Sequence, residues 1–550
     1  MATRCQSHLW IGHLQRMIYF SLVFASAAQP SDADTRKSRP HIVFILADDL
    51  GWADVSFHGC PQIPTPNLDA LASTGVLLNN HYVQPTCSPS RGVLLTGRYA
   101  IHIGFQEQPL VPRQLGGLSL DTKIMPEYLN DLGYESHILG KWHLGYFSFN
   151  YTPTYRGFDS FVGMHVGPTD YYTHVLKWDG HKGLDLWDNT EPLTTENGTY
   201  GTDLFTERAK SVIANRDKSK PLFLYFAQQA THGGVGPEPI EAPAENVAKF
   251  PYIHEDARKV YAGMTDALDQ SVGILVEALD EASMLRDTII VFSSDNGGAP
   301  SGPVSNRGIN WPLRGAKDSL YEGGIRSPAF LWTPDLLPRR RVSHQLMHAA
   351  DWLPTLYSAA GGDVDKLPPL DGFDMWRALT DGEESPRSEI LVNINAPAGE
   401  AALRYRNWKL VIGDFGEFNQ RIEIPGGSRP YEGLDEMMSN SRAAAVLKRL
   451  YGRDDVFEHA GQWRREATLT CGDDAAANAN FSPGAPYYVF DITNDPCELH
   501  NLSEERPEIL SMLLEKLEAY NKTVVPPVND TVDPLGAPER HNGVWAPWVY

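Results

Sequence analysis

The chain is poor in cysteine, in basic residues and in long apolar runs, and each shortage excludes a class of protein. Five cysteines in 550 residues are too few for a fold that depends on a disulfide framework. Asp and Glu (69) outnumber Lys and Arg (47), and the formal charge of −22 argues against nucleic acid as the main partner. No apolar run is long enough to cross a bilayer, so we expect no membrane span. The fold must rest on a hydrophobic core, and this length suffices for one large and one smaller domain.

The N-terminal residues have the pattern of a secretory signal peptide. Arg4 and Arg16 supply positive charge, residues 17–24 are apolar, and residues 25–27 are small, as at a cleavage site. We expect residues 1–28 to be a signal peptide and the protein to be lysosomal or extracellular; a short N-terminal membrane anchor is the alternative. Six sequons fit the secretory route as candidates for glycosylation: Asn150, Asn197, Asn480, Asn501, Asn521 and Asn529.

Short apolar runs alternate with helical patterns along residues 40–385, which predicts an α/β domain with a large mixed sheet flanked by helices. The run His41–Ala47 is apolar on both faces, as in a strand that is covered on both sides. Thr65 followed by Pro66 is typical of the start of a helix. The expected strands are 41–47, 135–142, 221–228 and 288–294, and the expected helices are 65–72, 124–132, 203–215 and 258–284.

The pattern changes after about residue 386, and we expect residues 386–550 to form a smaller α+β domain with an antiparallel sheet and one packing helix. Residues 413–485 are rich in Gly, Asp, Asn and Ala and show no clear periodicity. The aromatic residues Trp545 and Trp548 indicate that the C-terminal tail packs back on the protein. The expected elements are strands at 388–394, within 402–412 and at 487–492, and a helix at 505–520.

Two of the expected strands end directly in oxygen-bearing side chains. One runs into Asp48-Asp49 and the other into Asp295-Asn296. Because ligands bind at the carboxyl ends of strands in open α/β sheets, the two pairs can converge. Carboxylate and amide oxygens suit a hard cation such as Ca²⁺ or Mg²⁺. Taken alone, each pair is also typical of a turn or of a helix cap.

The run Cys87-Ser88-Pro89-Ser90-Arg91, followed by Leu-Thr-Gly-Arg at 95–98, is the most specific signal in the chain. It fits none of the usual spacings for thiol catalysis or zinc binding. It resembles the signature of the type I sulfatases, and within that family the chain is most similar to arylsulfatase B, the N-acetylgalactosamine-4-sulfatase. Other runs carry the resemblance over most of residues 40–380: 47–52, 140–145, 156–159, 170–172, 295–298, 310–315, 322–324 and 351–355.

The resemblance implies an alkaline-phosphatase-like sulfatase fold and hydrolysis of sulfuric esters. In that family the signature cysteine is oxidised to formylglycine, whose hydrate attacks sulfur. A formylglycine-generating enzyme would therefore be a partner during maturation. The implied substrate is an aryl sulfate or a sulfated glycan, such as N-acetylgalactosamine-4-sulfate in chondroitin or dermatan sulfate.

The resemblance also implies a role for individual side chains. One Ca²⁺ would be held by Asp48, Asp49, Asp295 and Asn296 together with residue 87. Arg91 would stabilise the hydrate, and Lys141 and Lys317 would bind sulfate oxygens. His143 and His232 would transfer protons, and His232 would also contact the substrate. Without the resemblance to the family, each of these lysines and histidines would be interpreted as an ordinary surface or loop residue.

The cysteines mark a departure from arylsulfatase B, which has more cysteines and several disulfides. Cys5 would leave with the signal peptide, and Cys87 would be converted. Cys471 and Cys497 are then candidates for one disulfide in an oxidising compartment, with Cys60 as a buried free thiol.

Three other functions stay open. The chain could belong to another arylsulfatase branch, or to the phosphodiesterases and phosphonate hydrolases of the wider superfamily. A sulfated-glycan binder without turnover is the alternative from a different class. The Cys87 run and the Gly-Lys-Trp-His run at 140–143 favour a sulfatase.

Overall fold

The computed structural model describes residues 39–234, 239–302, 305–458, 460–471, 481 and 483–550. The expected signal peptide and Asn480 lie outside the described residues, as do residues 235–238 in the loop after His232. Residues 39–550 group together as one unit.

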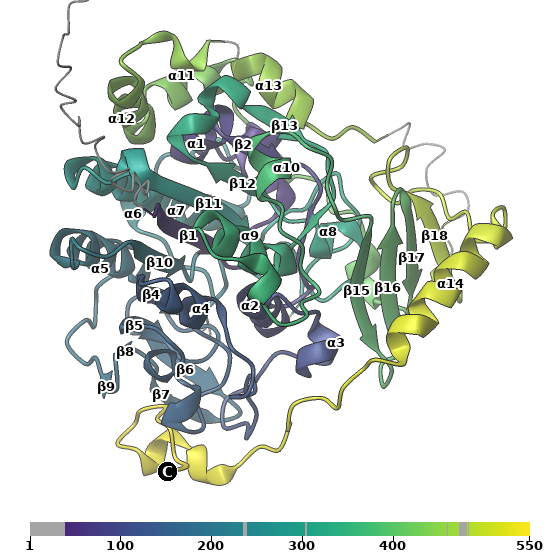
Figure 1. Cartoon of the computed structure of the whole chain (residues 1–550), viewed down its shortest axis with the longest axis horizontal. Helices are drawn as coiled ribbons and strands as arrows, with labels where there is room; N and C mark the ends of the chain where they lie inside the picture. The colour runs from purple at the N-terminus through teal and green to yellow at the C-terminus, as the bar shows by residue number, and fades with distance from the viewer. Residues whose placement is uncertain (1–38, 235–238, 303–304, 459, 472–480, 482) are drawn as a thin grey trace, which may run out of the picture. The chain divides into compact units, whose positions relative to one another are not determined.

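A mixed sheet runs through the centre of this unit (Figure 1), in the strand order β13-β2-β12-β11-β1-β10-β4-β5-β8-β9. Its middle strands β11, β1, β10, β4 and β5 are parallel, and β12 and β8 on either side are antiparallel to their neighbours. Strands 41–47, 135–142, 221–228 and 288–294 are therefore found as expected. The bounds are β1 His41–Ala47, β2 Val76–Leu78, β4 Glu135–Lys141, β5 Ser160–Met164, β8 Trp187–Asp188, β9 Glu191–Pro192, β10 Leu222–Ala227, β11 Thr288–Ser294, β12 Ala329–Trp332 and β13 Arg341–Ser343.

Helices cover both faces of this sheet because its central strands are apolar on both faces. In β1, Val43 and Ile45 join one core and Phe44 and Leu46 join the other, and all are buried. The first core is shared with α1 (Pro66–Thr74), α5 (Gly201–Asn215) and α7 (Asp256–Glu281). The second is shared with α2 (Cys87–Thr96), α4 (Met125–Asp131) and α9 (Trp352–Ala359).

A second, smaller sheet is antiparallel, in the order β15-β16-β17-β18, and α14 covers one of its faces (Figure 1). The large mixed sheet and this small sheet confirm the expected fold class. The sequence predicts one strand within residues 402–412, but the structure has two, because the chain reverses at Arg406, where φ is 56°. The bounds are β15 Glu389–Asn395, β16 Glu400–Tyr405, β17 Trp408–Ile412, β18 Tyr488–Asp491 and α14 Pro507–Asn521.

Three helices lie in the stretch where the sequence shows no clear periodicity. They are α11 (Gly433–Ser439), α12 (Arg442–Tyr451) and α13 (Ala460–Ala467), and they pack on α1 and α7 of the large sheet's first core. Each is short, with at most ten residues, and lies within a polar stretch. The boundary at residue 385 between a catalytic and a C-terminal domain stays a prediction.

Buried charges connect the two sheets. Lys409 of β17 places its Nζ atom 2.9 Å from Glu322 Oε1 and 2.7 Å from Glu498 Oε1, and the three side chains are fully buried. Glu322 begins α8 (Glu322–Ile325), next to the large sheet. The Tyr82 hydroxyl and Arg326 also bond to Glu322, at 2.6 and 3.3 Å. We call Glu322, Lys409, Glu498, Tyr82 and Arg326 the inter-sheet cluster.

Cys471 and Cys497 form a disulfide, with their Cα atoms 5.9 Å apart, and Cys60 is a buried free thiol.

As expected, the C-terminal tail packs back on the protein. Trp545 is fully buried, and its indole N–H donates to the Leu176 carbonyl at 3.1 Å. Among the described helices, none combines the length and apolarity needed to cross a membrane.

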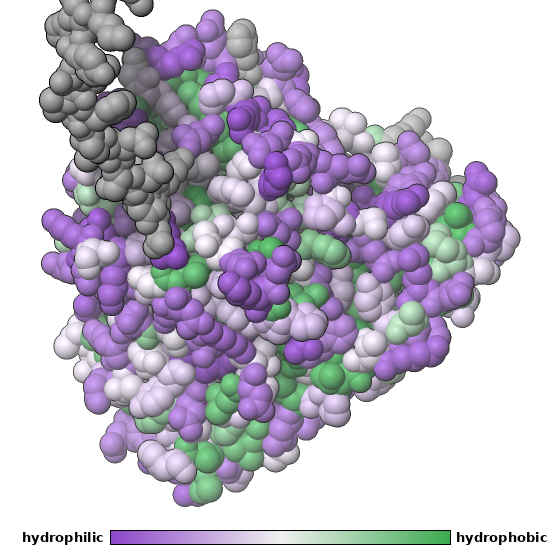
Figure 2. All heavy atoms as spheres, in the orientation of Figure 1, coloured by the Kyte–Doolittle hydropathy of each residue, from purple (hydrophilic) through white to green (hydrophobic). Residues whose placement is uncertain are grey.

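Hydrophilic residues predominate on the face seen in Figure 2. Four expected glycosylation sites are exposed: Asn150, Asn197, Asn521 and Asn529. Asn501 is half-buried, and its amide donates to the Tyr487 carbonyl at 3.1 Å.

Candidate active site

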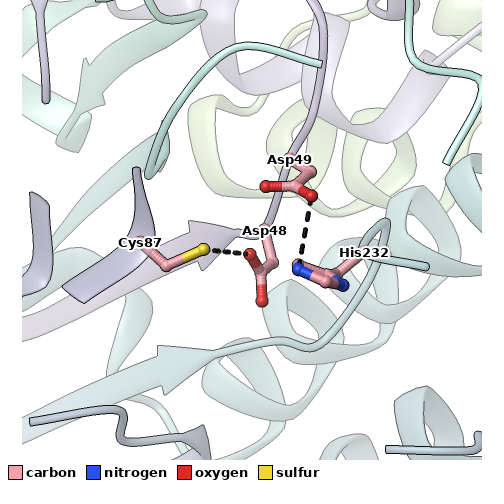
Figure 3. A group of neighbouring side chains, drawn as sticks. All are labelled: Asp48, Asp49, Cys87 and His232. Carbon is pink, nitrogen blue, oxygen red and sulfur yellow. Dashed lines mark hydrogen bonds and ion pairs between the residues drawn. The ribbon is translucent and has the colours of Figure 1, made fainter. Parts of the chain in front are cut away.

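The expected site residues come from six separate segments, the sixth being the loop with Lys317 before α8, and they meet at the carboxyl edge of the parallel strands. Asp48-Asp49 follow β1, Asp295-Asn296 follow β11, and Lys141 ends β4. Cys87 is the first residue of α2, and His232 lies in the loop after β10. Figure 3 shows Asp48, Asp49, Cys87 and His232 converging, each with one potential ligand atom within 4.8 Å of the others.

Asp48 is the point at which the cysteine and two cations meet. Cys87 Sγ donates to Asp48 Oδ1 at 3.6 Å, Lys141 Nζ donates to Oδ2 at 2.6 Å, and Arg91 Nη2 lies 3.6 Å from Oδ2. Burial works to raise the pKa of Asp48, but the cations, Lys141 foremost, outweigh it and hold that pKa well below its usual range. Asp48 is therefore ionised.

Three nitrogen atoms of Arg91 donate hydrogen bonds to two acceptors. Its Nε and Nη2 atoms donate to Asp295 Oδ2 at 3.1 and 2.9 Å, and its Nη1 atom donates to the Lys141 carbonyl at 2.8 Å. The guanidinium is fully buried. Burial, followed by the nearby Asp48 carboxylate, raises the pKa of Asp295. Arg91 therefore has one fixed orientation, one helical turn from Cys87.

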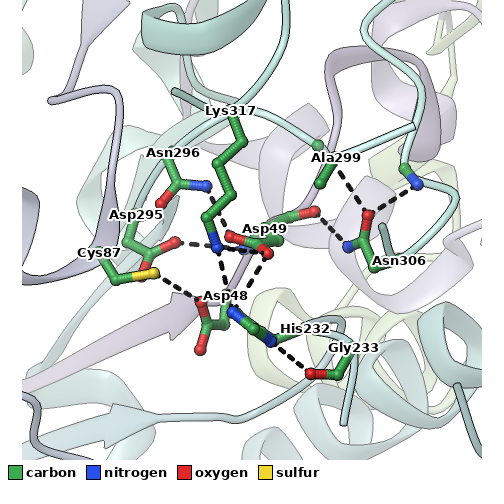
Figure 4. A network of polar contacts seen from close by, with 12 residues as sticks. Asp48, Asp49, Cys87, His232, Gly233, Asp295, Asn296, Ala299, Asn306 and Lys317 are labelled. Carbon is green, nitrogen blue, oxygen red and sulfur yellow. Dashed lines mark hydrogen bonds and ion pairs between the residues drawn. The ribbon is translucent and has the colours of Figure 1, made fainter. Parts of the chain in front are cut away.

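Asp49 forms the second half of the site (Figure 4). Lys317 Nζ donates to Asp49 Oδ2 at 2.8 Å and to His232 Nε2 at 3.0 Å. The Asn296 amide donates to Asp49 Oδ1 at 2.6 Å. Burial works to lower the pKa of Lys317, but the Asp49 carboxylate raises it well above its usual value. Lys317 is thus a buried, permanent cation.

Hydrogen bonds fix the tautomers of the two histidines. His143 Nε2 lies 2.8 Å from the Leu110 carbonyl, which can only accept, so Nε2 carries the proton. His143 Nδ1 has no hydrogen-bond partner in the described part of the chain and can accept a proton. His232 Nδ1 likewise donates to the Gly233 carbonyl at 2.6 Å, which leaves Nε2 as the acceptor from Lys317.

Both histidines are neutral at neutral pH. Burial, followed by the charge of Lys141, holds the pKa of His143 well below 6.5. Burial is also the main reason that the pKa of His232 falls to about 4. Each ring therefore offers one lone pair toward the site.

Cys87 is poorly suited to act as a thiol. Burial raises its pKa far above the ordinary value, although Lys141 and Lys317 oppose the shift. The thiol therefore stays protonated, and a protonated thiol is a weak nucleophile.

The donor set fits a hard cation. Asp48, Asp49 and Asp295 are buried carboxylates, and Asn296 is a buried amide. Asn296 Oδ1 has no hydrogen-bond partner among the described residues, so a buried oxygen is left with an open lone pair. Oxygen donors of this kind are those that Ca²⁺ prefers.

Three residues that the sequence did not single out hold the ligand loops in place. Asn306 Nδ2 donates to the carbonyls of Asp49 and Thr231 at 2.8 and 2.9 Å. Asn310 bonds to both backbone groups of Gly298, and Ser294 Oγ accepts from the Leu50 N–H. Their signal is weak, because an Asn in a Gly-rich loop is common in turns.

The mixed sheet with helices on both faces, and with buried acidic and basic side chains at its carboxyl edge, is typical of an α/β enzyme. A sequence model of the sulfatase family matches residues 40–362. Arylsulfatase J of Mus musculus is 37% identical over 543 residues, which cover 94% of this chain and 82% of that protein. Human N-acetylgalactosamine-6-sulfatase is 32% identical over 357 residues, 62% of this chain and 66% of that protein. The chain therefore belongs to the sulfatase family and is a sulfuric ester hydrolase.

A solved structure agrees with this assignment. The crystal structure of Ps i-CgsB in complex with k-i-k-neocarrahexaose superposes with a TM-score of 0.69 at 29% identity, covering 89% of this chain and 94% of that chain. These relatives support the sulfatase family, and not specifically the arylsulfatase B branch that the motifs favoured.

Proposed function

We propose that this protein removes sulfate from sulfated glycans, with N-acetylgalactosamine 4-sulfate of chondroitin or dermatan sulfate as its substrate. The reaction uses a formylglycine made from Cys87 and one Ca²⁺. The observation that carries the proposal is the position of Cys87 at the start of α2, with Sγ 3.6 Å from Asp48 and beside buried cations. A buried thiol that stays protonated has no evident use there unless it is converted.

Asp48, Asp49, Asp295 and Asn296 would hold the Ca²⁺, with residue 87 beside it. When bound, the ion supplies positive charge that polarises a sulfuryl oxygen. The hydrated aldehyde supplies a hydroxyl nucleophile that the thiol does not offer.

The cations of the site are suited to bind a sulfate group. Arg91, Lys141 and Lys317 are buried and charged, and their mutual hydrogen bonds with the three carboxylates fix their positions. Preorganised charges of this kind stabilise a transferring sulfuryl group without reorganisation.

The histidines move protons at defined atoms. His143 Nδ1 is free to take a proton from a hydroxyl on residue 87. A leaving oxygen needs a proton in return, which Lys141 Nζ or, after it has been protonated at Nε2, His232 can deliver.

The same proposal includes maturation in the secretory pathway. A formylglycine-generating enzyme would convert Cys87 there, and the mature protein would be lysosomal or extracellular. The disulfide between Cys471 and Cys497 and the exposed sequons support this route.

A second substrate is favoured by one observation. A relative with 32% identity is named N-acetylgalactosamine-6-sulfatase, so the 6-sulfate is the main competitor. The test is to measure inorganic sulfate released by the purified protein from N-acetylgalactosamine 4-sulfate, from the 6-sulfate and from 4-nitrophenyl sulfate, between acidic and neutral pH. Preferred release from the 4-sulfate supports the proposal, and preferred release from the 6-sulfate replaces the proposed substrate. Binding without release from any of them contradicts a catalytic function.

A further inference from the structure

A cavity of about 380 Å³ adjoins the candidate active site. Thr86 and Pro89, which line it, flank Cys87 in the sequence, and Asp318, also in its lining, directly follows Lys317. The Asp318 N–H donates to the Pro85 carbonyl at 3.0 Å, which ties the two catalytic segments together at the cavity wall. Its volume is at the lower end of small-molecule sites (roughly 300–1,000 Å³), and suits a single sugar rather than a chain.

The opposite wall comes from the small sheet. Asn393 and Asn395 of β15, Glu400 at the start of β16 and Asp414 after β17 all line the cavity. A molecule in this cavity would therefore touch both the catalytic segments and the small sheet.

The charge of the lining is the reverse of the charge of the sulfate-binding residues. Of the described residues that line the cavity, none is Lys, Arg or His, whereas four are acidic. Glu400 and Asp318 are close enough to interact. Burial, and then the Asp318 carboxylate, raises the pKa of Glu400. The four acidic residues are Glu107, Asp318, Glu400 and Asp414.

A second observation indicates that this wall binds a ligand. Asn393 is 6% exposed, and its amide N–H donates to the Gln106 carbonyl at 2.8 Å. Asn393 Oδ1 has no hydrogen-bond partner within the described chain, so a buried acceptor of the cavity lining is left open. An unpaired buried acceptor is costly unless a ligand or water completes it. Hydroxyl or amino hydrogens of a sugar are suitable donors.

We propose that this acidic cavity binds the sugar that carries the scissile sulfate. It favours sugars that present hydroxyl or amino hydrogens to the cavity wall, and it disfavours sugars that present a second anionic group there. The inference rests on the proposed sulfatase function. Arg91, Lys141 and Lys317 hold the sulfate, so its alcohol must extend toward a neighbouring opening. There Asn393, Glu400 and Asp318 accept hydrogen bonds, and the carboxylates of Glu400 and Asp318 repel a further sulfate or carboxylate. The substrate class is thus a monosulfated terminal sugar.

The test compares kcat/KM for N-acetylgalactosamine 4-sulfate and for its 4,6-disulfate. The variants are Glu400→Gln, Asp318→Asn and the two combined, which remove charge and keep shape. Glu281→Gln is the matched control, because Glu281 is exposed at the end of α7. We expect the double variant to raise the disulfate-to-monosulfate ratio of kcat/KM about tenfold, as the loss of two repulsions near a protein surface predicts. Hydrolysis of 4-nitrophenyl sulfate, which carries no second anion, is measured for every variant, and the control Glu281→Gln should leave it within about twofold.

A ratio that moves no more than in Glu281→Gln would overturn the inference while leaving the sulfatase function intact. The unsubstituted protein provides an independent measurement that does not depend on how the variants fold. Its preference for the monosulfate should weaken as salt rises, because salt screens the repulsion. A preference that does not respond to salt also overturns the inference. No sulfate release from any substrate by the unsubstituted protein would overturn the proposed function itself, and this inference with it.

Discussion

Two buried groups of charges in this protein look alike but differ in their position. The strand-end cluster contains Asp48, Asp49, Asp295, Arg91, Lys141 and Lys317, and the inter-sheet cluster is centred on Lys409 between Glu322 and Glu498. Among the described residues, a buried oxygen without a hydrogen bond occurs at both: Asn296 Oδ1 beside the first cluster, and Glu498 Oε1 in the second, 2.7 Å from Lys409 Nζ. The strand-end cluster lies at the carboxyl ends of β1, β4 and β11, next to Cys87, whereas the inter-sheet cluster joins the two sheets. Buried charge and unpaired atoms alone are therefore weak support for function, and a position at the carboxyl edge of the parallel strands is stronger support.

The largest expected difference concerns Cys87. Cys87→Ser should lower multiple turnover of N-acetylgalactosamine 4-sulfate by at least about 10³-fold, because a serine cannot supply the hydrated aldehyde. The midpoint of thermal unfolding should stay nearly unchanged. Cys60→Ala is the matched control, since Cys60 is also a buried free thiol but lies in a separate apolar cluster. Full steady-state turnover in Cys87→Ser would contradict the formylglycine mechanism.

Lys409→Met tests the opposite expectation for the inter-sheet cluster. Removing the cation deprives the buried carboxylates of Glu322 and Glu498 of the ammonium group that they share, and we expect a loss of about 3–5 kcal/mol in the free energy of unfolding. The kcat of the folded fraction should stay within about twofold, because Lys409 touches no catalytic group. Lys516→Met is the control, since Lys516 is 32% exposed in its pair with Glu389 and should change stability by less than about 1 kcal/mol. A large fall in kcat for Lys409→Met would remove the distinction between the clusters.

Asp295→Asn tests whether the strand-end cluster binds metal. The substitution keeps the shape but removes one charge, so bound Ca²⁺ and turnover should fall together, with turnover down by about 10²-fold. Metal analysis of the purified variant and a Ca²⁺ titration of its activity measure the two effects. Asp185→Asn is the control, because Asp185 is buried and accepts two backbone N–H bonds away from the site. Unchanged Ca²⁺ content in Asp295→Asn would contradict its role as a ligand.

The smallest expected effect is a pH dependence of stability from Glu498. Burial, opposed by Lys409 and reinforced by Glu322, raises the pKa of Glu498 from 4.5 to about 7. A carboxyl group whose pKa is higher in the folded state stabilises the fold fully below about pH 4.5, and this contribution is lost as pH rises through 7. The unsubstituted protein should therefore lose about 1–3 kcal/mol between pH 4.5 and 7 relative to Glu498→Gln. Parallel stability curves for the two proteins would show that Glu498 does not carry this effect.

The large sheet could be predicted from the sequence because its signals are local. The strands at 41–47 and 288–294 are short runs of apolar residues, and each leads directly into its carboxylates. The rule that parallel strands expose their carboxyl ends at one edge then predicts that Asp48 and Asp295 converge. Lys317 and His232 were found only through the family resemblance, because loop residues carry no periodic signal.

What could not be predicted depends on contacts between distant residues. Lys409 and Glu322 are 87 positions apart, and nothing near either residue indicates their pairing. The acceptor role of Asn393 likewise depends on the Gln106 carbonyl, 287 positions away. Helix α12 was missed for another reason. Its apolar residues Ala443, Val446, Leu447 and Leu450 do follow helical spacing, but the helix spans only ten residues within a polar stretch.

The most direct test is the mass of the peptide that contains residue 87, taken from protein that has passed through a secretory pathway and releases sulfate. The proposed mechanism places an aldehyde at this position, because burial keeps the Cys87 thiol protonated. We therefore predict the mass of formylglycine in the active fraction. An unmodified cysteine in protein that turns over sulfate esters would contradict the central claim.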